Sequence, residues 1–375
     1  MNVLITFDEI FLKGKNQPVF LRKLKDNLIA LFSGISVSRV QGGFILKNFM
    51  ETELARLAKI PGIAKFSEVV RCPNDFESIT KTISIMNFDS NIEKFRISAN
   101  RLDKKHPSSS RDLNISIGDW VRNHFGWTVD LEKFDLDLHV DVVKDDARIY
   151  KRMADGAGGL PTGSLGKVLC LISGGIDSSV AAYQMMKRGA EVSLIHFQNQ
   201  TSVADEVSRK ILDLGNVLAS YQPKVELIIY PFAEIQKQII MKIKSDHRMI
   251  VSRRLMFKIA ETIALNKKCG ALATGDSLGQ VASQTIENLS CIYDAVKILK
   301  LAPLISFNKV DIMHLARKIG TLDISNRPYE DCCSLFVAKH PETKAKLHNI
   351  EMMEKGLELD ALDKIKPISY YLGKN

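Results

Sequence analysis

The order of hydrophobic and polar positions predicts a parallel α/β sheet in the C-terminal part of the chain. One continuous apolar run, 168–172, and three mainly apolar runs, 192–197, 225–230 and 271–274, are typical of strands that are buried on both faces. Three stretches with the spacing of amphipathic helices alternate with these strands: 178–188, 234–244 and 252–266. This order predicts an open sheet that binds its ligand beyond the carboxyl ends of its strands.

The N-terminal part has shorter runs, which predict small α+β modules. The elements expected there are strands at 43–46 and 95–99 and helices at 20–32, 51–60 and 115–125. A Pro61-Gly62 turn separates two such modules. Residues 154–166 contain five glycines and one proline, which is the composition of a linker between the two parts.

Composition and charge narrow the class of protein. The 375 residues are 45% hydrophobic and 25% charged, which excludes a disordered or fibrous chain. A net charge of +9 favours a polyanionic partner such as nucleic acid, although a merely basic enzyme would share it. Six cysteines without a C-x-x-C pair predict a reducing compartment. Without a basic leader or an apolar run of roughly 18 residues, we expect a cytoplasmic protein without membrane contact.

The sequence Ser-Gly-Gly-Ile-Asp-Ser at 173–178 is the strongest sign of chemistry, because it directly follows a predicted buried strand and precedes a helix. Gly174 and Gly175 let the backbone approach a ligand, and successive N–H groups at a helix N-terminus can hold phosphate oxygens. The hydroxyls of Ser173 and Ser178 add hydrogen-bond donors. The alternative is an ordinary glycine-rich turn.

This loop is neither a Walker A motif nor a dinucleotide-binding fingerprint. It lacks the Gly-Lys-Ser/Thr ending of the first and the G-x-G-x-x-G spacing of the second. A carboxylate at Asp177 would repel a phosphate unless a cation lay between them. We therefore expect Asp177 to hold Mg²⁺ or to orient pyrophosphate.

The loop resembles the PP-loop of ATP pyrophosphatases, which bind ATP, release pyrophosphate and leave AMP on the substrate. Segments over nearly the whole chain are similar to the tRNA 4-thiouridine synthetase (ThiI) family: 9–10, 12–16, 158–161, 196–197, 253–256, 274–285, 319–321 and 329–333. The longest of them, 274–285, reads Thr-Gly-Asp-Ser-Leu-Gly-Gln-Val-Ala-Ser-Gln-Thr. The resemblance implies an α/β chain, in which a parallel-sheet PP-loop domain of the adenine nucleotide α hydrolase type follows two α+β modules. The expected parts are a ferredoxin-like module at 1–60, a THUMP RNA-binding domain at 61–155, a linker at 156–166, the catalytic domain at 167–345 and a helical tail at 346–375.

The resemblance also implies which residues hold adenine and ribose beside the phosphate loop: Leu171, Ile172, His196, Phe197, Arg253, Gly275 and Gln284. Each has an alternative reading. The aliphatic and aromatic members could belong to the core, and His196 could be a satisfied buried histidine. Arg254 could take the place of Arg253.

A basic stretch in the expected THUMP domain is a candidate contact for the tRNA backbone. Six basic residues stand there against one acid, Asp103: Lys94, Arg96, Arg101, Lys104, Lys105 and Arg111. The alternative is a solvated basic loop, because aromatic residues for base stacking are scarce in this stretch.

Two adjacent cysteines are candidates for sulfur transfer, which needs a thiolate that can accept sulfur as a persulfide. The resemblance favours Cys333 as the carrier, with Cys332 as the second choice, and both could instead be small hydrophobic residues. Cys269 together with this pair is an alternative set of iron-sulfur ligands. We expect the other three cysteines, Cys72, Cys170 and Cys291, to be structural.

Together these features predict an ATP- and Mg²⁺-dependent sulfurtransferase that adenylates a uridine of tRNA, at position 8 in the family, and replaces its O4 with sulfur. The chain ends at Asn375 without a rhodanese domain, so we expect sulfur from a cysteine desulfurase or another persulfide or sulfide donor. A homodimer is left open. Two alternatives are a PP-loop enzyme with another substrate and a non-catalytic tRNA-binding protein. The latter is suggested by Ser179 where the family has Pro, and by the departure at 133–135; Asp8, where the family has Gly, is a further departure.

Overall fold

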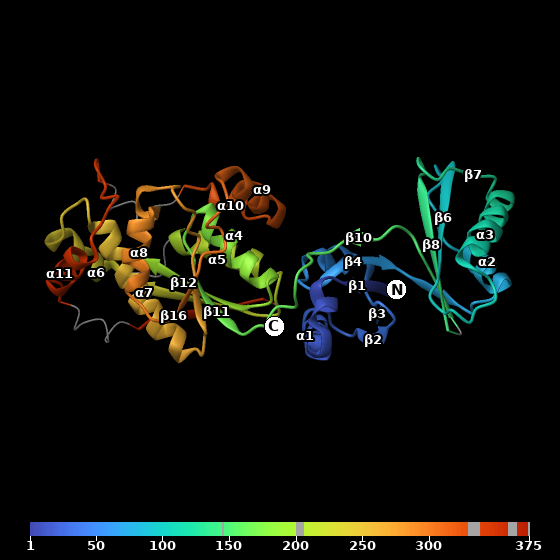
Figure 1. Cartoon of the computed structure of the whole chain (residues 1–375), viewed down its shortest axis with the longest axis horizontal. Helices are drawn as coiled ribbons and strands as arrows, with labels where there is room; N and C mark the ends of the chain where they lie inside the picture. Colours follow the sequence, from blue (N-terminus) through green and yellow to red (C-terminus); the bar gives the residue numbers. More distant parts are fainter. Residues whose placement is uncertain (145, 200–205, 329–337, 359–365, 374–375) are drawn as a thin grey trace. The chain divides into compact units, whose positions relative to one another are not determined.

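A computed structural model describes residues 1–144, 146–199, 206–328, 338–358 and 366–373 (Figure 1). The chain divides into two compact units. The first contains residues 1–11, 32–59 and 63–158, and the second contains residues 12–31, 60–62 and 159–375. Of the helices in the described ranges, none has both the length and the apolar character that crossing a membrane requires.

The first unit contains two separate five-stranded sheets. One sheet is antiparallel and has the order β10-β4-β1-β3-β2. Its strands are β1 (Val3–Phe7), β2 (Ser36–Val40), β3 (Gly43–Lys47), β4 (Ile63–Glu68) and β10 (Ala154–Asp155). Because β4 and β10 lie in this sheet, the N-terminal module extends past residue 60 and includes the first residues of the expected linker region.

The second sheet of this unit is mixed and has the order β5-β9-β8-β6-β7. Its strands are β5 (Val70–Cys72), β6 (Lys94–Arg101), β7 (Thr128–Val129), β8 (Leu136–Val143) and β9 (Asp146–Tyr150). The helices α2 (Phe76–Ser84) and α3 (Ser110–Phe125) pack on it around a hydrophobic core that includes Ile79, Phe95 and Ile117. A capping box between Ser109 and Asp112 starts α3, and Gly126 ends it in the left-handed conformation.

The second unit is built on a six-stranded sheet with the order β15-β14-β11-β12-β13-β16. Five strands are parallel: β11 (Lys167–Leu171), β12 (Glu191–Gln198), β13 (Val225–Pro231), β14 (Ala271–Ala273) and β15 (Leu299–Leu301). The edge strand β16 (Ile368–Leu372) is antiparallel to β13. The strand order reverses direction between β11 and β14, and the crevice beyond such a switch point is where open α/β sheets bind ligands.

Helices cover both faces of this sheet, because successive strand residues face opposite sides. Val168 and Cys170 of β11 belong to one core, and Leu169 between them belongs to the other. The first core is covered by α4 (Ile176–Lys187), α5 (Glu206–Leu218), α9 (Lys309–Ile319) and α10 (Leu322–Ser325). The second is covered by α6 (Ala233–Lys242), α7 (Arg248–Asn266), α8 (Ile286–Asp294) and α11 (Leu347–Lys355).

The predicted parallel sheet is therefore confirmed, while several predicted elements differ in type or in bounds, among them the helix expected at 115–125, which begins at Ser110. Residues 51–59 form a 3₁₀ helix, η2 (Glu51–Lys59), whereas helical spacing alone predicted an ordinary helix. The helix expected at 252–266 begins four residues earlier, at Arg248. The tail expected to be helical contains α11 and also β16, whose Ile-Ser-Tyr-Tyr-Leu sequence is rich in strand-forming residues.

Candidate active site

A cavity of about 620 Å³ lies at the carboxyl ends of β11 and β14 and is lined by residues that are far apart in the sequence. Ten of the residues predicted to bind nucleotide or to act beside it line this cavity: Leu171, Ile172, Ser173, Asp177, Ser178, His196, Phe197, Arg253, Gly275 and Gln284. Gly174 and Gly175 are in the same turn but are not among the lining residues. The fold thus brings one end of β11, β12, β14 and α7 to a single hollow.

The turn between β11 and α4 is held in shape by its own serines. The hydroxyl of Ser178, which is buried in the first turn of α4, accepts the backbone N–H of Ser173 at 3.0 Å. The hydroxyl of Ser173 accepts the N–H of Gly175 at 3.2 Å, and Gly175 is the N-cap of α4. The two side chains predicted as ligand donors therefore also keep the helix N-terminus open toward the cavity.

Gly275 allows the loop after β14 to approach this turn closely. A Cβ atom at residue 275 would lie 2.7 Å from the backbone nitrogen of Ser178 and 2.8 Å from the carbonyl carbon of Asp177. Only a residue without a side chain fits there, because neither backbone atom can move without displacing α4. The approach of β14 to the N-terminus of α4 therefore depends on this glycine.

We expect Gly275→Ala to weaken nucleotide binding by about tenfold or more, since a displacement of about 1 Å at a site can cost about 10²-fold. Fluorescence titration with an ATP analogue measures the affinity. Gly270→Ala is the matched control, because its Cβ would lie 4.0 Å from the nearest atom, the carbonyl oxygen of Lys167. Equal affinities for wild type and Gly275→Ala would contradict the role of this close approach.

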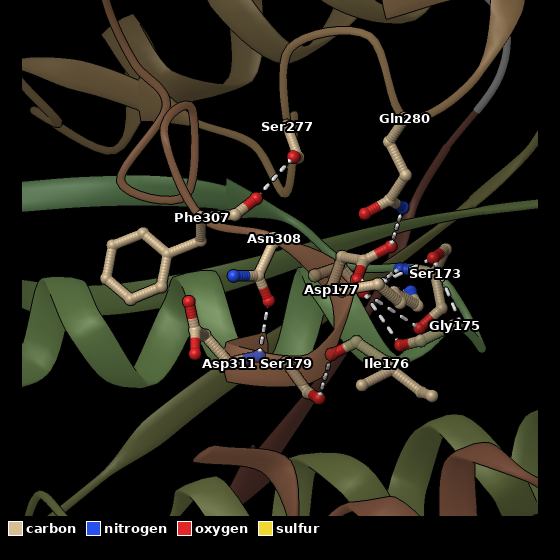
Figure 2. Close-up of polar contacts among 12 residues, drawn as sticks. Ser173, Gly175, Ile176, Asp177, Ser179, Ser277, Gln280, Phe307, Asn308 and Asp311 are labelled. Atoms are coloured by element: carbon tan, nitrogen blue, oxygen red, sulfur yellow. Dashed lines mark hydrogen bonds and ion pairs between the residues drawn. The ribbon is translucent and has the colours of Figure 1, made fainter. Parts of the chain in front are cut away.

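Asp177, in the first turn of α4, is held between two donors from other segments. Gln280 Nε2 donates to its Oδ2 at 2.9 Å, as Figure 2 shows. Lys309 Nζ, at the first residue of α9, lies 2.6 Å from its Oδ1. The Asp177 side chain keeps 22% of its surface exposed, so it is accessible from the cavity mouth. An ammonium group therefore lies beside the carboxylate, where a phosphate group would otherwise be repelled.

The segments that carry these two donors are tied to each other. Ser277 Oγ donates to the carbonyl oxygen of Phe307 at 2.8 Å, which is visible in Figure 2. The backbone N–H of Leu278 donates to Ile305 O at 3.0 Å. Asn308 caps α9 by accepting the N–H of Asp311 at 2.9 Å. These bonds fix the N-terminus of α9, and with it Lys309, opposite the N-terminus of α4.

Asp276 is a second, deeply buried acid at the wall of the cavity. It accepts hydrogen bonds from Arg253 Nη2 at 2.7 and 2.8 Å, from Thr274 Oγ1 at 2.7 Å, from the hydroxyl of Tyr293 at 2.8 Å and from Gln284 Nε2 at 3.1 Å. Burial acts to raise the pKa of Asp276, but the charge of Arg253 and these hydrogen bonds outweigh it, so the net pKa lies below its ordinary value. Asp276 thus remains ionised and orients Arg253 and Gln284.

Arg253 and Arg254, the two candidates for the nucleotide-binding arginine, lie in different places. Arg253 lines the cavity, whereas Arg254 is buried on the other side of α7. Arg254 Nε donates to Glu354 Oε1 at 2.7 Å, and its Nη1 contacts the carbonyl oxygen of Cys291. Arg254 therefore joins α7 to α8 and α11, and its role is structural.

The chemistry of the cavity wall fits an adenine nucleotide. His196 is buried, and because its Nδ1 lies 2.9 Å from the carbonyl oxygen of Ile172, that nitrogen carries a proton. Phe197 lines the cavity and also packs against Tyr230 and Phe232 in the core. Gln284 Oε1 is buried and has no hydrogen-bond partner among the described residues. A buried acceptor of this kind is costly unless a ligand donor such as an amino or hydroxyl group meets it.

The structure describes four of the six cysteines, but not the pair predicted to carry sulfur. Cys332 and Cys333 lie outside the described residues. Burial raises the pKa of the thiols of the four described cysteines, Cys72, Cys170, Cys269 and Cys291, so these thiols are poor nucleophiles at neutral pH. Within the described ranges, no group of three or more His, Cys, Asp or Glu side chains could hold a metal ion.

The six basic residues predicted to contact RNA fall into two groups. Lys94 and Arg96 stand on β6 and are paired with acids, namely Asp130 at 3.1 Å and Asp137. The pKa of Asp130 falls to about 2. Its carboxylate accepts backbone N–H groups, of which that of Lys133 lowers the pKa most, and the Lys94 ammonium lowers it further. The other four follow along β6 and into the start of α3: Arg101, Lys104, Lys105 and Arg111. Among the described residues, the exposed ammonium groups of Lys104 and Lys105 form no ion pair with an acid, so positive charge concentrates in the second group.

Three residues of this site were not predicted individually. Asp276 and Gln280 lie in the 274–285 segment, but their sequence context does not reveal which side chains they contact. Lys309 is 132 residues away from Asp177 and carries no motif. Only the fold brings α9 beside α4.

The fold and the cavity define a PP-loop α/β domain for an adenine nucleotide, preceded by two α+β modules. Family models match the three parts: a ThiI ferredoxin-like domain at 2–67, a THUMP domain at 73–151, and "Thiamine biosynthesis protein (ThiI)" at 163–359. The chain belongs to the ThiI family.

Relatives and a solved structure are similar to this chain over nearly its full length. A probable tRNA sulfurtransferase of Moorella thermoacetica is 39% identical over 95% of this chain and 93% of its own. Another, from a Geobacillus species, is 37% identical over 96% of this chain and 92% of its own. The crystal structure of a 4-thiouridine synthetase in complex with RNA and bound ATP superposes with a TM-score of 0.87, at 29% identity and 99% coverage of both chains.

Proposed function

We propose that this chain is an ATP-dependent tRNA sulfurtransferase that converts a uridine of tRNA to 4-thiouridine. The observation that carries the proposal is the close approach of Gly275 to the N-terminus of α4 at the switch point of the sheet, which opens into the 620 Å³ cavity. Helix N–H groups face the place where phosphates would lie, and Asp177, Lys309 and Arg253 stand around it. Names and structures of the relatives give the same substrate class.

ATP is needed because the O4 of uridine is a poor leaving group. In the first step, O4 attacks the α-phosphorus of ATP, the bond from that phosphorus to the bridging oxygen breaks, N3 gives up its proton and pyrophosphate leaves. The helix N-terminus and Lys309 stabilise the charge that develops on the departing oxygens. This role requires donors that are in place before the reaction, which the bonds between 277–278 and 305–307 provide.

Asp177 is suited to a Mg²⁺ ion that enters with ATP. Magnesium sites in nucleotide enzymes commonly use one or two carboxylates and complete their coordination with phosphate oxygens and water. Asp177 is the partly exposed carboxylate at the phosphate end of the cavity, whereas Asp276 is buried and accepts two or more hydrogen bonds on each oxygen. When bound, the ion would neutralise charge on the leaving pyrophosphate.

In the second step, we place the transferred sulfur on Cys333. The outer sulfur of its persulfide attacks C4, the C4–O bond breaks and AMP leaves. A second thiol, Cys332 or an external one, then attacks the inner sulfur, so that a disulfide forms and the outer sulfur stays on C4. The high pKa of the four described thiols makes them poor candidates for this step. Ala338, five residues after Cys333, lines the cavity, and five residues of chain span at most about 18 Å.

Two partners follow from this chemistry. One is tRNA, bound by the THUMP domain through the basic group around the start of α3. The other is a protein with a persulfide, such as a cysteine desulfurase, which passes its outer sulfur to the Cys333 thiolate. Sulfide can reload Cys333 only by attacking the disulfide left by the previous turnover, because that disulfide accepts the two electrons.

Because, in the part of the chain that the structure describes, Lys94 is paired with an acid and the basic residues near the start of α3 are not, we expect the two groups to contribute differently to tRNA binding. Replacing Lys104, Lys105 and Arg111 together with Ala should weaken tRNA binding and lower the slope of log K against log salt by about 2 to 3, since each phosphate contact contributes about one unit. Lys94→Ala should change both much less, because Lys94 is already paired with Asp130. Filter binding across a salt series measures both quantities. Equal effects of the two variants would contradict the division.

The function itself is tested by mass spectrometry of tRNA nucleosides after incubation with the protein, ATP and sulfide. We expect 4-thiouridine to form only when ATP is present. The alternative of a non-catalytic tRNA-binding protein predicts binding without any thiolated nucleoside. An enzyme acting on another base would give a different modified nucleoside in the same spectra.

A further inference from the structure

A buried asparagine behind the cavity joins two segments of its wall. Asn288, in the first turn of α8, has no exposed surface. Its Nδ2 donates to the carbonyl oxygen of Ala282 at 2.8 Å and to that of Glu342 at 2.7 Å. Its Oδ1 accepts the backbone N–H of Ala345 at 3.0 Å. Both hydrogens of the amide are therefore used, and each one holds a residue that lines the cavity.

The neighbouring threonine adds a parallel link. Thr285, the N-cap of α8, accepts the N–H of Asn288 at 3.2 Å and donates its hydroxyl hydrogen to the carbonyl oxygen of Thr343 at 2.7 Å. We call Thr285 and Asn288 the α8 clamp. The clamp fixes residues 342–345 to the loop that follows Gly275 and Asp276.

Residues 342–345, which the clamp holds, follow the proposed sulfur carrier closely in the sequence. Glu342 is nine residues after Cys333, and Ala338 and Pro341, which stand between them in the sequence, line the cavity. The loop on the other side of the clamp carries Gln280, which holds Asp177. The clamp thus connects the segment nearest to the phosphate site with the segment that leads back to the proposed sulfur carrier.

We propose that the α8 clamp positions the sulfur-carrying part of the chain against the nucleotide cavity, and that Asn288 is a positioning residue for sulfur transfer rather than for adenylation. This inference rests on the proposed function. Adenylation uses the turn after β11, Lys309 and the loop after β14. The side chain of Asn288 bonds to this loop at Ala282, and the loop is tied independently to 305–307 through Ser277 and Leu278. Sulfur transfer also requires the chain around residue 342 to be in place. Loss of the clamp should therefore uncouple the two steps.

The test compares two rates in the full-length protein with tRNA, ATP and a cysteine desulfurase with cysteine as the persulfide donor: pyrophosphate release and 4-thiouridine formation. Asn288→Asp has the same shape but replaces two donor hydrogens with an acceptor that faces two carbonyl oxygens. We expect its ratio of 4-thiouridine to pyrophosphate to fall by about tenfold, since misplacing a reacting group by about 1 Å can cost about 10²-fold. Thr285→Val keeps the size of the side chain, loses both the bond to Thr343 and the cap of α8, and should lower the ratio in the same direction.

Asn27→Ala is the matched control. Asn27 is also buried, and its Nδ2 donates to the backbone oxygen of Thr162 at 2.9 Å, but it does not line the cavity. A purely structural role for Asn288 predicts that both rates fall together in its variants, as they would through lost stability in Asn27→Ala. An unchanged ratio in both clamp variants would overturn the inference. Wild-type protein that releases no pyrophosphate with tRNA would instead overturn the proposed function.

Amide hydrogen exchange gives a second measurement that does not depend on activity. The N–H of Ala345 is bonded to Asn288 Oδ1, so its exchange should accelerate in Asn288→Ala and remain unchanged in Asn27→Ala. Unchanged protection of Ala345 in Asn288→Ala would show that 342–345 is held by other contacts, and it would also overturn the inference.

Discussion

Replacing Asp177 with Ala should reduce tRNA-dependent pyrophosphate release by about 10²- to 10³-fold, the loss that follows removal of one preorganised electrostatic group from an active site. The carboxylate lies in the first turn of α4, between Lys309 and Gln280. Without it, Lys309 loses the charge that orients its ammonium group, and the ion expected with ATP loses its protein ligand. Formation of 4-thiouridine should fall by the same factor, because adenylation comes first. Both rates are measured in the same reaction.

The stability of Asp177→Ala should change little, so loss of activity cannot be mistaken for unfolding. A partly exposed ion pair typically contributes only about 0 to 1 kcal/mol to the free energy of unfolding. Asp323→Ala, an exposed acid in the short helix α10, is a suitable control for any general effect of removing a charge. Pyrophosphate release by Asp177→Ala at the wild-type rate would remove this residue from the catalytic machinery.

Replacing Cys333 with Ser should abolish 4-thiouridine formation and leave pyrophosphate release in place. A serine hydroxyl cannot carry a transferable sulfur, so the uridine would be adenylated but not thiolated. The variant should therefore consume ATP in the presence of tRNA and yield no modified nucleoside. Nucleoside mass spectrometry and a pyrophosphate assay on the same samples distinguish the two steps.

Two further variants assign the roles of the thiols. Cys332→Ser should slow turnover only where Cys332, rather than an external thiol, attacks the inner sulfur. Cys72→Ser is the control, because this thiol is half-buried in the first unit and burial raises its pKa. If Cys333→Ser still made 4-thiouridine while Asp177→Ala did not, adenylation would stand and the persulfide role of Cys333 would be wrong.

Much of the catalytic fold follows from local patterns. Apolar runs such as 168–172 and 225–230 predict buried parallel strands, because strands covered on both faces have no polar side, and β11 and β13 lie there. The turn at 173–178 is predictable for a similar reason, since glycines, serines and an acid between a strand and a helix leave few other structures. The resemblance to a known family then places residues such as Gly275 and Gln284 in the same cavity.

What the patterns could not predict are contacts between distant segments. Lys309 reaches Asp177 only because α9 packs beside α4, and no periodicity in the sequence specifies that pairing. The same limit applies to Asn288, which reads as an ordinary polar residue of a helix and is in fact fully buried. The basic stretch at 94–111 is a further example. Its acid partners Asp130 and Asp137 lie on other strands and loops, so their pairing with Lys94 and Arg96 appears only in the folded sheet.

The most direct test of the central claim identifies the bond of ATP that this protein breaks. ATP labelled at the α-phosphate is incubated with the purified protein, Mg²⁺, a persulfide donor and either tRNA or no RNA, and the labelled products are separated. If the amides at the head of α4 hold the triphosphate as proposed, label should appear in AMP, with an equal amount of pyrophosphate, only when tRNA is present. Label in ADP, or no AMP above background with tRNA bound, would contradict that claim.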